Sequence, residues 1–461
     1  MAEAIGILGE IVEKKKADLA ERYAGVTLDS LRSQAEPTTQ SLRAAMAMPR
    51  ARFILEIKKA SPSLGAIRTA ADPAVIARGY AGVADGLSVL ADGAYFGGSL
   101  GDVRAARAEF DGPILAKDFF IDLRQVPEAR LAGADAILVM LSVLDDEEAT
   151  AMIAEGRRLN MDALVEVHDE AEMRRALALD AQLIGINNRD LRDLSIDLAT
   201  TEKLAALAGD RTIISESGVH SRSDVERLSP HVDGFLVGSS LMKADDPAEA
   251  ARELVYGRVK LCGLRTPEDA KAARPARYAG LMFIPESPRY ISLEEAEALA
   301  EAAPPSLLLV GVFRNAPVGE IQVIAERLKL HAVQLHGDED RSYRDRLRRH
   351  LPEGTQIWQA VSAGRPAEEH ADADRLLFDN AGGGTGEPFD WAVVEDHPAM
   401  IDALVAGGLG AHNARAAYAL GCHAIDVGSS VDAQPGTKSH EKIAAVFDAL
   451  RHPSRKEISC A

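Results

Sequence analysis

The same arrangement of small residues lies near the end of each half of the chain. In the first half, residues 214–219 (ISESGV) precede residues 235–240 (FLVGSS). In the second half, residues 405–409 (VAGGL) precede residues 425–430 (IDVGSS). Each pair indicates strand, small-residue loop, helix, strand and loop, as in the last two βα-loops of a (β/α)8 barrel, whose backbone N–H groups hold a phosphate. The repetition predicts two barrels and two phosphorylated small-molecule substrates.

The rest of the chain supports this division. Each half contains eight short apolar runs separated by helical patterns, which is typical of parallel strands buried on both faces. The runs are residues 53–58, 87–90, 114–117, 136–140, 163–167, 183–186, 212–215 and 234–237, then 258–262, 280–284, 307–312, 332–335, 357–360, 376–379, 403–406 and 424–427. We therefore predict an α/β fold of two consecutive (β/α)8 TIM barrels. Residues 1–256 would form the first, with an N-terminal helical extension, residues 257–452 the second, and residues 453–461 a frayed tail.

Composition narrows the classes of partner. A net charge of −19 over 461 residues argues against nucleic acid or an anionic membrane as the main partner. No apolar stretch is long enough to span a bilayer, and the N-terminus lacks the apolar segment of a signal peptide. The cysteines, Cys262, Cys422 and Cys460, lack the spacing of a disulfide framework or a zinc site. We expect a cytoplasmic monomer without metal or cofactor.

Charged and polar side chains collect at the predicted strand ends of the first half. They are Glu56 and Lys58 on the first strand, Lys117 on the third, Glu166 on the fifth, Asn187 after the sixth and Glu216 after the seventh. Barrel active sites lie at this rim, and lysines among glutamates in a closed site are suited to proton transfer. The alternative is an internal ion-pair network that only fills the barrel top.

Five segments of the first half carry a family resemblance. They are residues 56–63 (EIKKASPS), 117–119 (KDF), 166–167 (EV), 185–191 (GINNRDL) and 215–218 (SESG). Together they resemble indole-3-glycerol-phosphate synthase over nearly all of this half. The resemblance implies ring closure, decarboxylation and dehydration of carboxyphenylamino-deoxyribulose phosphate to indole-3-glycerol phosphate. Leu64 and Ala91 replace a Lys and a Thr that relatives often carry, which bears only on loop dynamics and substrate affinity.

The resemblance also implies roles for the residues at this rim. The implied catalytic residues are Lys117, Glu166, Lys58, Glu56, Asn187 and Glu216, and the implied substrate and phosphate ligands are Ser61, Arg189, Ser217, Gly218, Gly238 and Ser239. Lys117 would draw electrons from the substrate carbonyl as an acid, and Glu166 would transfer a proton during the loss of water. The family leaves the division between Lys117 and Lys58 open. Ser61 and Ser63 also fit the simpler role of loop caps.

Two residues stand out in the second half, Cys262 at the end of the first strand and Asp379 at the end of the sixth. A lone Cys is more often a small buried hydrophobe, and a lone Asp can cap a turn. Six segments surround or accompany them: residues 259–264 (VKLCGL), 287–290 (SPRY), 311–313 (GVF), 333–337 (VQLHG), 383–386 (GGTG) with 389–391 (FDW), and 406–409 (AGGL). These segments resemble phosphoribosylanthranilate isomerase over the whole half.

The second resemblance implies an Amadori rearrangement. Asp379 would protonate the furanose ring oxygen, and Cys262, as a thiolate, would take the proton from C2. Such a base needs thiolate character, so we expect a lowered pKa of the Cys262 thiol. Arg289 would bind the anthranilate carboxylate with its bidentate fork, and the implied phosphate ligands are Gly408, Gly428 and Ser429. His336 fits the family motif and equally fits a structural histidine.

The two implied reactions are consecutive, because the product of the second half is the substrate of the first. The whole chain thus resembles a fusion of two steps of tryptophan biosynthesis. Two other classes stay open. A Schiff-base aldolase would use Lys117 or Lys58 as a nucleophile and would be trapped by borohydride, whereas a scaffold of inactive barrels would not need the complete acid–base sets that this chain carries.

Overall fold

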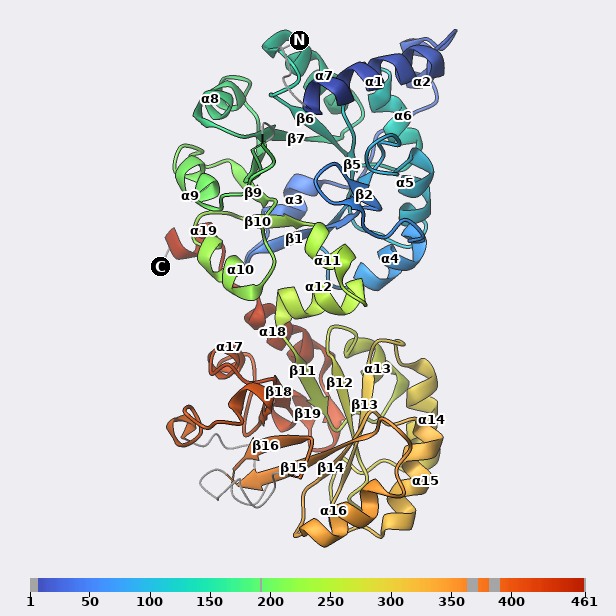
Figure 1. The fold of residues 1–461 in the computed structure, drawn as a ribbon, viewed down its shortest axis with the longest axis vertical. Coiled ribbons are helices and arrows are strands. Elements are labelled where there is room, and N and C mark those ends of the chain that lie inside the picture. Colours follow the sequence, from blue (N-terminus) through green and yellow to red (C-terminus); the bar gives the residue numbers. More distant parts are fainter. Residues whose placement is uncertain (1–6, 191–192, 363–371, 381–389, 460–461) are drawn as a thin grey trace. The chain divides into compact units, whose positions relative to one another are not determined.

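The computed structural model describes residues 7–190, 193–362, 372–380 and 390–459. The chain divides into two compact units, Met1–Leu254 with His452–Ala461, and Val255–Arg451. Each unit contains a closed barrel of parallel strands (Figure 1). The predicted fold of two consecutive (β/α)8 barrels is therefore confirmed. Within the described ranges, no helix combines the length and the apolar content that crossing a membrane requires.

The first barrel follows chain order around its ring and closes where β1 pairs with both β10 and β4. Its strands are β1 Arg52–Ile57, β4 Gly86–Leu90, β5 Ile114–Lys117, β6 Ala136–Met140, β7 Asp162–Val167, β8 Leu183–Asn187, β9 Thr212–Glu216 and β10 Gly234–Val237. Its helices are α4 Pro73–Tyr80, α5 Leu100–Arg107, α6 Gln125–Leu131, α7 Asp146–Arg158, α8 Glu170–Ala178, α9 Ala199–Ala205, α10 Arg222–Leu228, α11 Ser239–Lys243 and α12 Pro247–Tyr256. Strands β4, β6 and β10 are buried along their whole length, which explains their continuous apolar sequence.

An N-terminal extension precedes this barrel, with helices α1 Ile7–Arg22, α2 Leu28–Arg32 and α3 Leu42–Met46. A buried lysine fixes α1 to the rim. Lys15 Nζ lies 2.8 Å from Asp92 Oδ1 and 2.6 Å from Asp118 Oδ1, and these two carboxylates follow β4 and β5. A buried charge needs such partners. The ion pairs therefore hold α1 where its apolar side chains reach the barrel mouth.

The second barrel has the same topology, and β11 pairs with β12 and β18. Its strands are β11 Val259–Cys262, β12 Tyr278–Met282, β13 Leu308–Phe313, β14 Ala332–Leu335, β15 Gln356–Ser362, β16 Arg375–Asp379, β17 Leu404–Val405 and β18 Ala424–Val427. Its helices are α13 Pro267–Ala272, α14 Leu293–Ala302, α15 Val318–Leu328, α16 Arg341–Arg348, α17 Ala414–Tyr418 and α18 His440–Leu450, with 3-10 turns at Trp391–Val393, Met400–Asp402 and Ser429–Val431. The fully buried Trp358 packs edge-on against Tyr278 in its core, with ring centroids 5.1 Å apart.

Two short antiparallel hairpins at the rims were not predicted. One pairs β2 Ala60–Ser61 with β3 Gly65–Ala66 after the first strand of the first barrel. The other pairs β19 Asp432–Gln434 with β20 Thr437–Lys438 after the last strand of the second barrel. Both are too short to produce a visible alternation of apolar and polar residues, so the sequence pattern does not reveal them.

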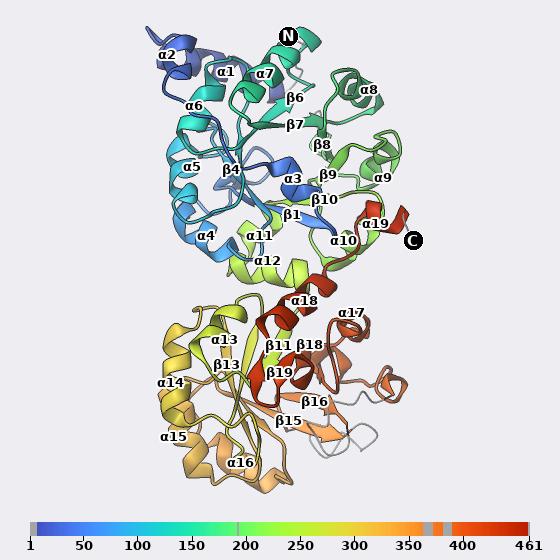
Figure 2. The same cartoon turned by 180° about the vertical axis from the view of Figure 1, so that it is seen from behind.

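The prediction of a frayed tail is wrong over Arg455–Ser459, which form helix α19 in the first unit. Figures 1 and 2 both show α19 beside α10. Arg455 Nε donates to Asp233 Oδ2 at 3.1 Å, and the Arg50 backbone N–H donates to Glu457 Oε2 at 2.6 Å. Asp233 is almost fully buried, so the tail supplies the cation that this carboxylate needs. Cys460 lies outside the described residues.

Candidate active sites

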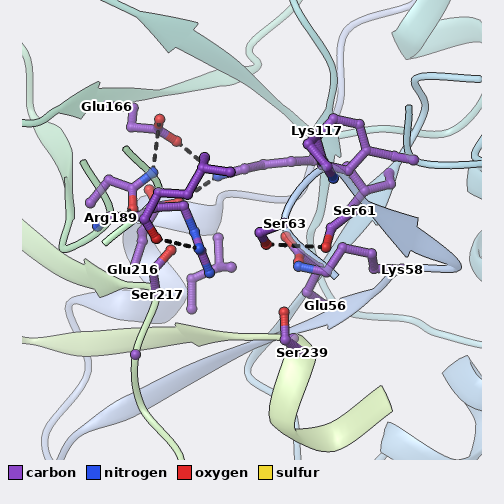
Figure 3. A pocket seen from close by; sticks show the side chains of 18 of the residues that line it. Glu56, Lys58, Ser61, Ser63, Lys117, Glu166, Arg189, Glu216, Ser217 and Ser239 are labelled. Carbon is purple, nitrogen blue, oxygen red and sulfur yellow. Dashed lines mark hydrogen bonds and ion pairs between the residues drawn. The ribbon is translucent and has the colours of Figure 1, made fainter. Parts of the chain in front are cut away.

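One pocket lies at the carboxyl-terminal rim of the first barrel (Figure 3). The structure brings all the predicted residues of this half together around it: Glu56, Lys58, Ser61, Lys117, Glu166, Asn187, Arg189, Glu216, Ser217, Gly218, Gly238 and Ser239. Ile7, Leu8 and Ile11 of α1 add an apolar wall, together with Phe96. The pocket thus combines charged groups from the strand ends with an apolar wall, as is typical of small-molecule sites.

Lys117 is the centre of the charged cluster. Its Nζ lies 3.0 Å from Glu166 Oε2 and 2.5 Å from Glu216 Oε2. Asn187 Nδ2 donates to the other oxygen of Glu166 at 3.2 Å. Burial alone would favour the neutral amine, but the nearby carboxylates outweigh it and raise the pKa of Lys117. Lys117 is therefore a cationic hydrogen-bond donor, positioned between two buried carboxylates.

The two carboxylates beside Lys117 differ in their pKa. Burial raises the pKa of Glu216 to about 7, against the opposing effect of Lys117. The pKa of Glu166 is lowered, because Lys117 and His168 together outweigh its burial. Among the described residues, Glu216 Oε1 has no hydrogen-bond partner, and a Cβ on Gly185 would come within 2.0 Å of it. Gly185 therefore makes room for a carboxylate that can titrate near neutral pH.

A second ion pair lies on the first strand. Lys58 Nζ donates to Glu56 Oε1 at 2.6 Å, and Ser88 Oγ donates to Glu56 Oε2 at 3.3 Å. Gly238 lies so close that a Cβ there would meet Glu56 Oε1 at 2.4 Å. Glu56 thus anchors Lys58 at the pocket wall, apart from the carboxylates that hold Lys117.

The predicted phosphate ligands lie on the loops after β9 and β10 and on the first hairpin. Ser217 has a left-handed backbone with φ +63°, and Gly218 follows with φ +88°. A non-glycine residue in this region costs free energy, and such strain concentrates at functional loops. Gly238 precedes Ser239, the first residue of α11. Ser61, Ser63 and Ser239 are labelled in Figure 3, and Ser61 Oγ lies 3.5 Å from Ser63 Oγ.

His168 was missed by the sequence reasoning. Its Nε2 lies 3.3 Å from Glu166 Oε1 and its Nδ1 lies 3.0 Å from Glu172 Oε2. Burial would lower the pKa of His168, but the two glutamates raise it to about 10, so the ring is a second cation beside Glu166. The sequence offered one signal for His168, its position two residues after Glu166. At the end of β7, this spacing places both side chains on the same side of the chain.

In the second barrel, the structure places Cys262 at the end of β11 and Asp379 at the end of β16, as predicted from the sequence. The expectation of a lowered thiol pKa is wrong. Burial raises the pKa of Cys262, and Lys260 opposes that effect only in part. The thiol is 8% exposed and packs with Ile284 and Val312, so the apolar wall accounts for the direction of the shift.

Arg289 and the loop of Gly428 and Ser429 lie beside a buried ionic network. Arg289 Nε donates to Asp432 Oδ2 at 2.9 Å, and Lys438 Nζ donates to Asp432 Oδ1 at 2.7 Å and to the Gly428 carbonyl at 2.8 Å. Hairpin β19–β20 thus fixes the guanidinium of Arg289 and the loop that carries Gly428 and Ser429. Asp432 and Lys438 were not predicted, because their role depends on a hairpin that the sequence did not reveal.

Other predicted positions of the second half have mixed outcomes. Gly408 has φ +61°, a backbone that glycine adopts without strain. Burial lowers the pKa of His336 to about 3, so its ring is neutral, as in a structural histidine. The segments 383–386 and Phe389 lie outside the described residues. Within the described part of the chain, no group of three His, Cys, Asp or Glu side chains is arranged to hold a metal ion.

Two barrel rims, each with buried acid–base groups beside small-residue loops, define the class: a two-site enzyme that acts on phosphorylated small molecules. A family model of indole-3-glycerol phosphate synthase matches residues 8–254, and one of N-(5'phosphoribosyl)anthranilate (PRA) isomerase matches residues 259–449.

Individual relatives cover nearly the whole chain. Tryptophan biosynthesis protein TrpCF of Salmonella typhi is 44% identical over 450 residues, which is 96% of this chain and 99% of that protein. The Yersinia pestis protein of the same name is also 44% identical, over 96% of this chain and 94% of its own. The crystal structure of phosphoribosyl anthranilate isomerase from Thermus thermophilus matches 42% of this chain and 98% of its own, with 34% identity and a TM-score of 0.39.

The chain belongs to the family of bifunctional tryptophan-biosynthesis enzymes. Its N-terminal half is an indole-3-glycerol phosphate synthase, and its C-terminal half is a phosphoribosylanthranilate isomerase. The isomerase performs the Amadori rearrangement, and the synthase cyclises, decarboxylates and dehydrates its product. Both resemblances read from the sequence are thereby confirmed.

Proposed function

We propose that the first barrel closes the indole ring with Lys117 as the general acid. The aromatic carbon that bears the carboxylate attacks the keto carbon of the sugar chain, and the carbonyl oxygen takes a proton from Lys117 as the new C–C bond forms. Carbon dioxide then leaves and restores the aromatic ring. The single observation that carries this proposal is the position of the Lys117 ammonium between Glu166 and Glu216, at 3.0 Å and 2.5 Å.

Glu166 is proposed as the base of the dehydration that follows. The new hydroxyl leaves as water with a proton from Lys117 or Lys58, and Glu166 accepts the proton lost from the carbon next to the nitrogen. The lowered pKa of Glu166, due to Lys117 and His168 against its burial, supports this role because it keeps the carboxylate ionised. Asn187 orients Glu166 through the hydrogen bond of 3.2 Å.

The remaining residues of the pocket are proposed to hold the substrate. Ser61, Ser217, Gly218, Gly238 and Ser239 would bind the phosphate through hydroxyl and backbone donors. In the same pocket, Glu56 and Lys58 would orient the sugar hydroxyls and the substrate amine, and Arg189 would face the anionic end of the substrate. Burial lowers the pKa of Arg189. That shift indicates a guanidinium whose charge is poorly hydrated and suited to an anionic ligand.

In the second barrel, Asp379 is proposed as the acid that opens the furanose ring and Cys262 as the base that removes the C2 proton. The ring C–O bond breaks as Asp379 protonates the oxygen, which leaves a Schiff base. Loss of the C2 proton to the thiolate then gives the enolamine. Arg289 would bind the anthranilate carboxylate, and Gly408, Gly428 and Ser429 the phosphate. The hydrogen bond from Arg289 Nε to Asp432 supports this role of Arg289, because it fixes the plane of the guanidinium group.

A Schiff-base aldolase is the rival reaction for the first barrel. Its nucleophile must be a neutral amine. The raised pKa of Lys117, where the carboxylates outweigh burial, opposes that requirement. Borohydride reduction in the presence of substrate is expected to leave Lys117 unmodified, and a stable adduct on Lys117 would favour the aldolase.

The pH dependence of the synthase tests the role of Glu216. Below pH 7, Glu216 gains a proton and no longer holds Lys117 by charge, so kcat/KM should fall as the pH drops through about 7. Glu216→Gln should lose this limb and show a rate that is lower by about 10- to 100-fold and flat from about pH 6 to 8. The isomerase activity of the same sample is the control. A limb that persists in the variant belongs to the substrate phosphate or to another group.

We further propose the domain limits and the assembly state. The synthase domain would take residues 8–254 together with the tail that carries α19, and the isomerase domain residues 259–449. We also propose that the protein is a cytoplasmic monomer. Sedimentation at micromolar concentration should give one species near 49 kDa. A stable dimer would contradict this part of the proposal.

A further inference from the structure

We propose that Lys260 is a positioning residue of the isomerase, whose buried ammonium stabilises Cys262 as a thiolate and is itself held by Asp426. The inference rests on the proposed role of Cys262 as the base. Lys260 has no part in the roles assigned above, and it is one of the largest fully buried side chains in the described part of the chain.

The strand geometry brings the three groups together. Lys260 and Cys262 are two residues apart on β11, so their side chains point to the same side, into the barrel. In the parallel register, Lys260 lies opposite Asp426 of the neighbouring strand β18. The Lys260 ammonium donates to Asp426 Oδ2 at 2.8 Å, and its side chain is 0% exposed.

A glycine leaves the space in which the ammonium and the thiol meet. Gly280 on β12 lies opposite Cys262 in the register. A Cβ at this position would come within 2.9 Å of Cys262 Sγ and 3.1 Å of Lys260 Nζ. Both atoms thus border the same small volume, and Lys260 is within hydrogen-bonding reach of the thiol.

A fully buried ion pair is an unfavourable choice if its only role is to fill the barrel interior. Burying two charges costs more than packing apolar side chains of the same volume, so a purely structural position would be served as well by Leu or Met. The pair is also incomplete, because Asp426 Oδ1 has no hydrogen-bond partner among the described residues. Burying the Lys260 ammonium costs free energy, and the ammonium lies beside the proposed base. We therefore infer that its positive charge has a function.

The electrostatics around the thiol agree with this role. Burial raises the pKa of Cys262, and Asp426 adds to that effect, whereas Lys260 and Lys438 lower it. Lys260 is the largest opposing influence, through its charge and a hydrogen bond. His336, the residue after β14, is near enough for the charge of Lys260 to act on it, but its ring is neutral, since burial lowers its pKa to about 3. Without Lys260, the Cys262 thiol would be surrounded by apolar side chains and the Asp426 carboxylate, and both would favour its protonated form.

The test is the reactivity of Cys262 in the full chain. Alkylation by iodoacetamide is followed for the Cys262 peptide by mass spectrometry across pH 6 to 10, in the wild type and in Lys260→Met. We expect the thiol titration of the variant to move up by about one pH unit or more, with alkylation at least about tenfold slower at pH 8. The isomerase kcat/KM should fall about tenfold near pH 7.5 and recover in part as the pH rises. An unchanged thiol titration would overturn the proposal.

A double variant separates charge from packing. Lys260→Met with Asp426→Asn removes both charges and leaves no unpaired ion in the barrel. If Lys260 acts through its charge, Cys262 stays harder to ionise than in the wild type. If the pair is only structural, the double variant restores the wild-type titration. Synthase activity of each sample reports an intact chain, and the thermal transition of the isomerase unit reports its fold.

The outcome also distinguishes this inference from the proposed function. Full isomerase activity in Cys262→Ser would end the role of Cys262 as the base, whatever Lys260 does. An inactive Cys262→Ser together with an unshifted thiol in Lys260→Met would leave the base in place and remove Lys260 alone.

Discussion

Lys117→Met is expected to abolish the formation of indole-3-glycerol phosphate while the isomerase continues to run. Methionine keeps the length of the side chain but can neither donate a proton nor carry a charge. Removing a general acid costs about 10²- to 10⁴-fold, and Lys117 is also the shared partner of Glu166 and Glu216, so we expect a loss of at least about 10³-fold in kcat/KM. This corresponds to about 4 kcal/mol of transition-state stabilisation.

The measurement supplies phosphoribosylanthranilate and follows indole fluorescence and released carbon dioxide. In Lys117→Met, the carboxyphenylamino-deoxyribulose phosphate should accumulate, since only the second step is blocked. The matched control is Lys16→Met, which breaks an exposed ion pair of 2.6 Å with Glu13 outside the pocket and should leave both rates within about twofold. Formation of indole-3-glycerol phosphate at the wild-type rate in Lys117→Met would remove Lys117 from the chemistry. Loss of both activities would mean that the two halves are not independent.

The barrels and the synthase rim were predictable from the sequence for a physical reason. Parallel strands buried on both faces must be continuously apolar, so their ends are visible as the points where polar residues begin. Lys117 at the end of β5 and Glu216 at the end of β9 were found in this way, although they are 99 residues apart. A closed barrel forces all strand ends onto one rim, so their convergence follows from the fold alone.

What the sequence could not show depends on partners across strands and on burial. His168 and Lys260 each lie two residues from a predicted site residue, but only the structure shows which carboxylates they contact. The raised pKa of Cys262 arises from the apolar wall around it, and no local pattern encodes that wall. The wrong prediction of a frayed tail has the same cause. The sequence gives no sign that Arg455 pairs with the buried Asp233, and only the fold shows this contact.

Cys262→Ser should have the converse effect of the lysine variant. Serine keeps the shape of the residue, but its hydroxyl does not ionise in the range where a thiol does, so the base that removes the C2 proton is lost. We expect a fall in the isomerase kcat/KM of about 10³-fold or more, with the synthase unchanged when carboxyphenylamino-deoxyribulose phosphate is supplied directly. With phosphoribosylanthranilate as the only substrate, neither the intermediate nor indole-3-glycerol phosphate should appear.

The control for this variant is Cys422→Ser in the same barrel. Cys422 is buried at 6% exposure, and its Sγ contacts the Ala417 carbonyl, away from the predicted ligands. Burial raises the pKa of Cys422 to about 12, and among the described residues no lysine opposes that effect as Lys260 does at Cys262, so Cys422 stays a neutral thiol at neutral pH. A serine there buries a hydroxyl that can donate to the same Ala417 carbonyl, so the cost falls on the stability of the barrel and isomerase activity should stay within about threefold of the wild type. If both serine variants lose activity equally, the loss reports damage to the barrel. If only Cys262→Ser loses isomerase activity, the thiol at the end of β11 is the base. The two substitutions are chemically identical and differ only in the position of the thiol that is removed.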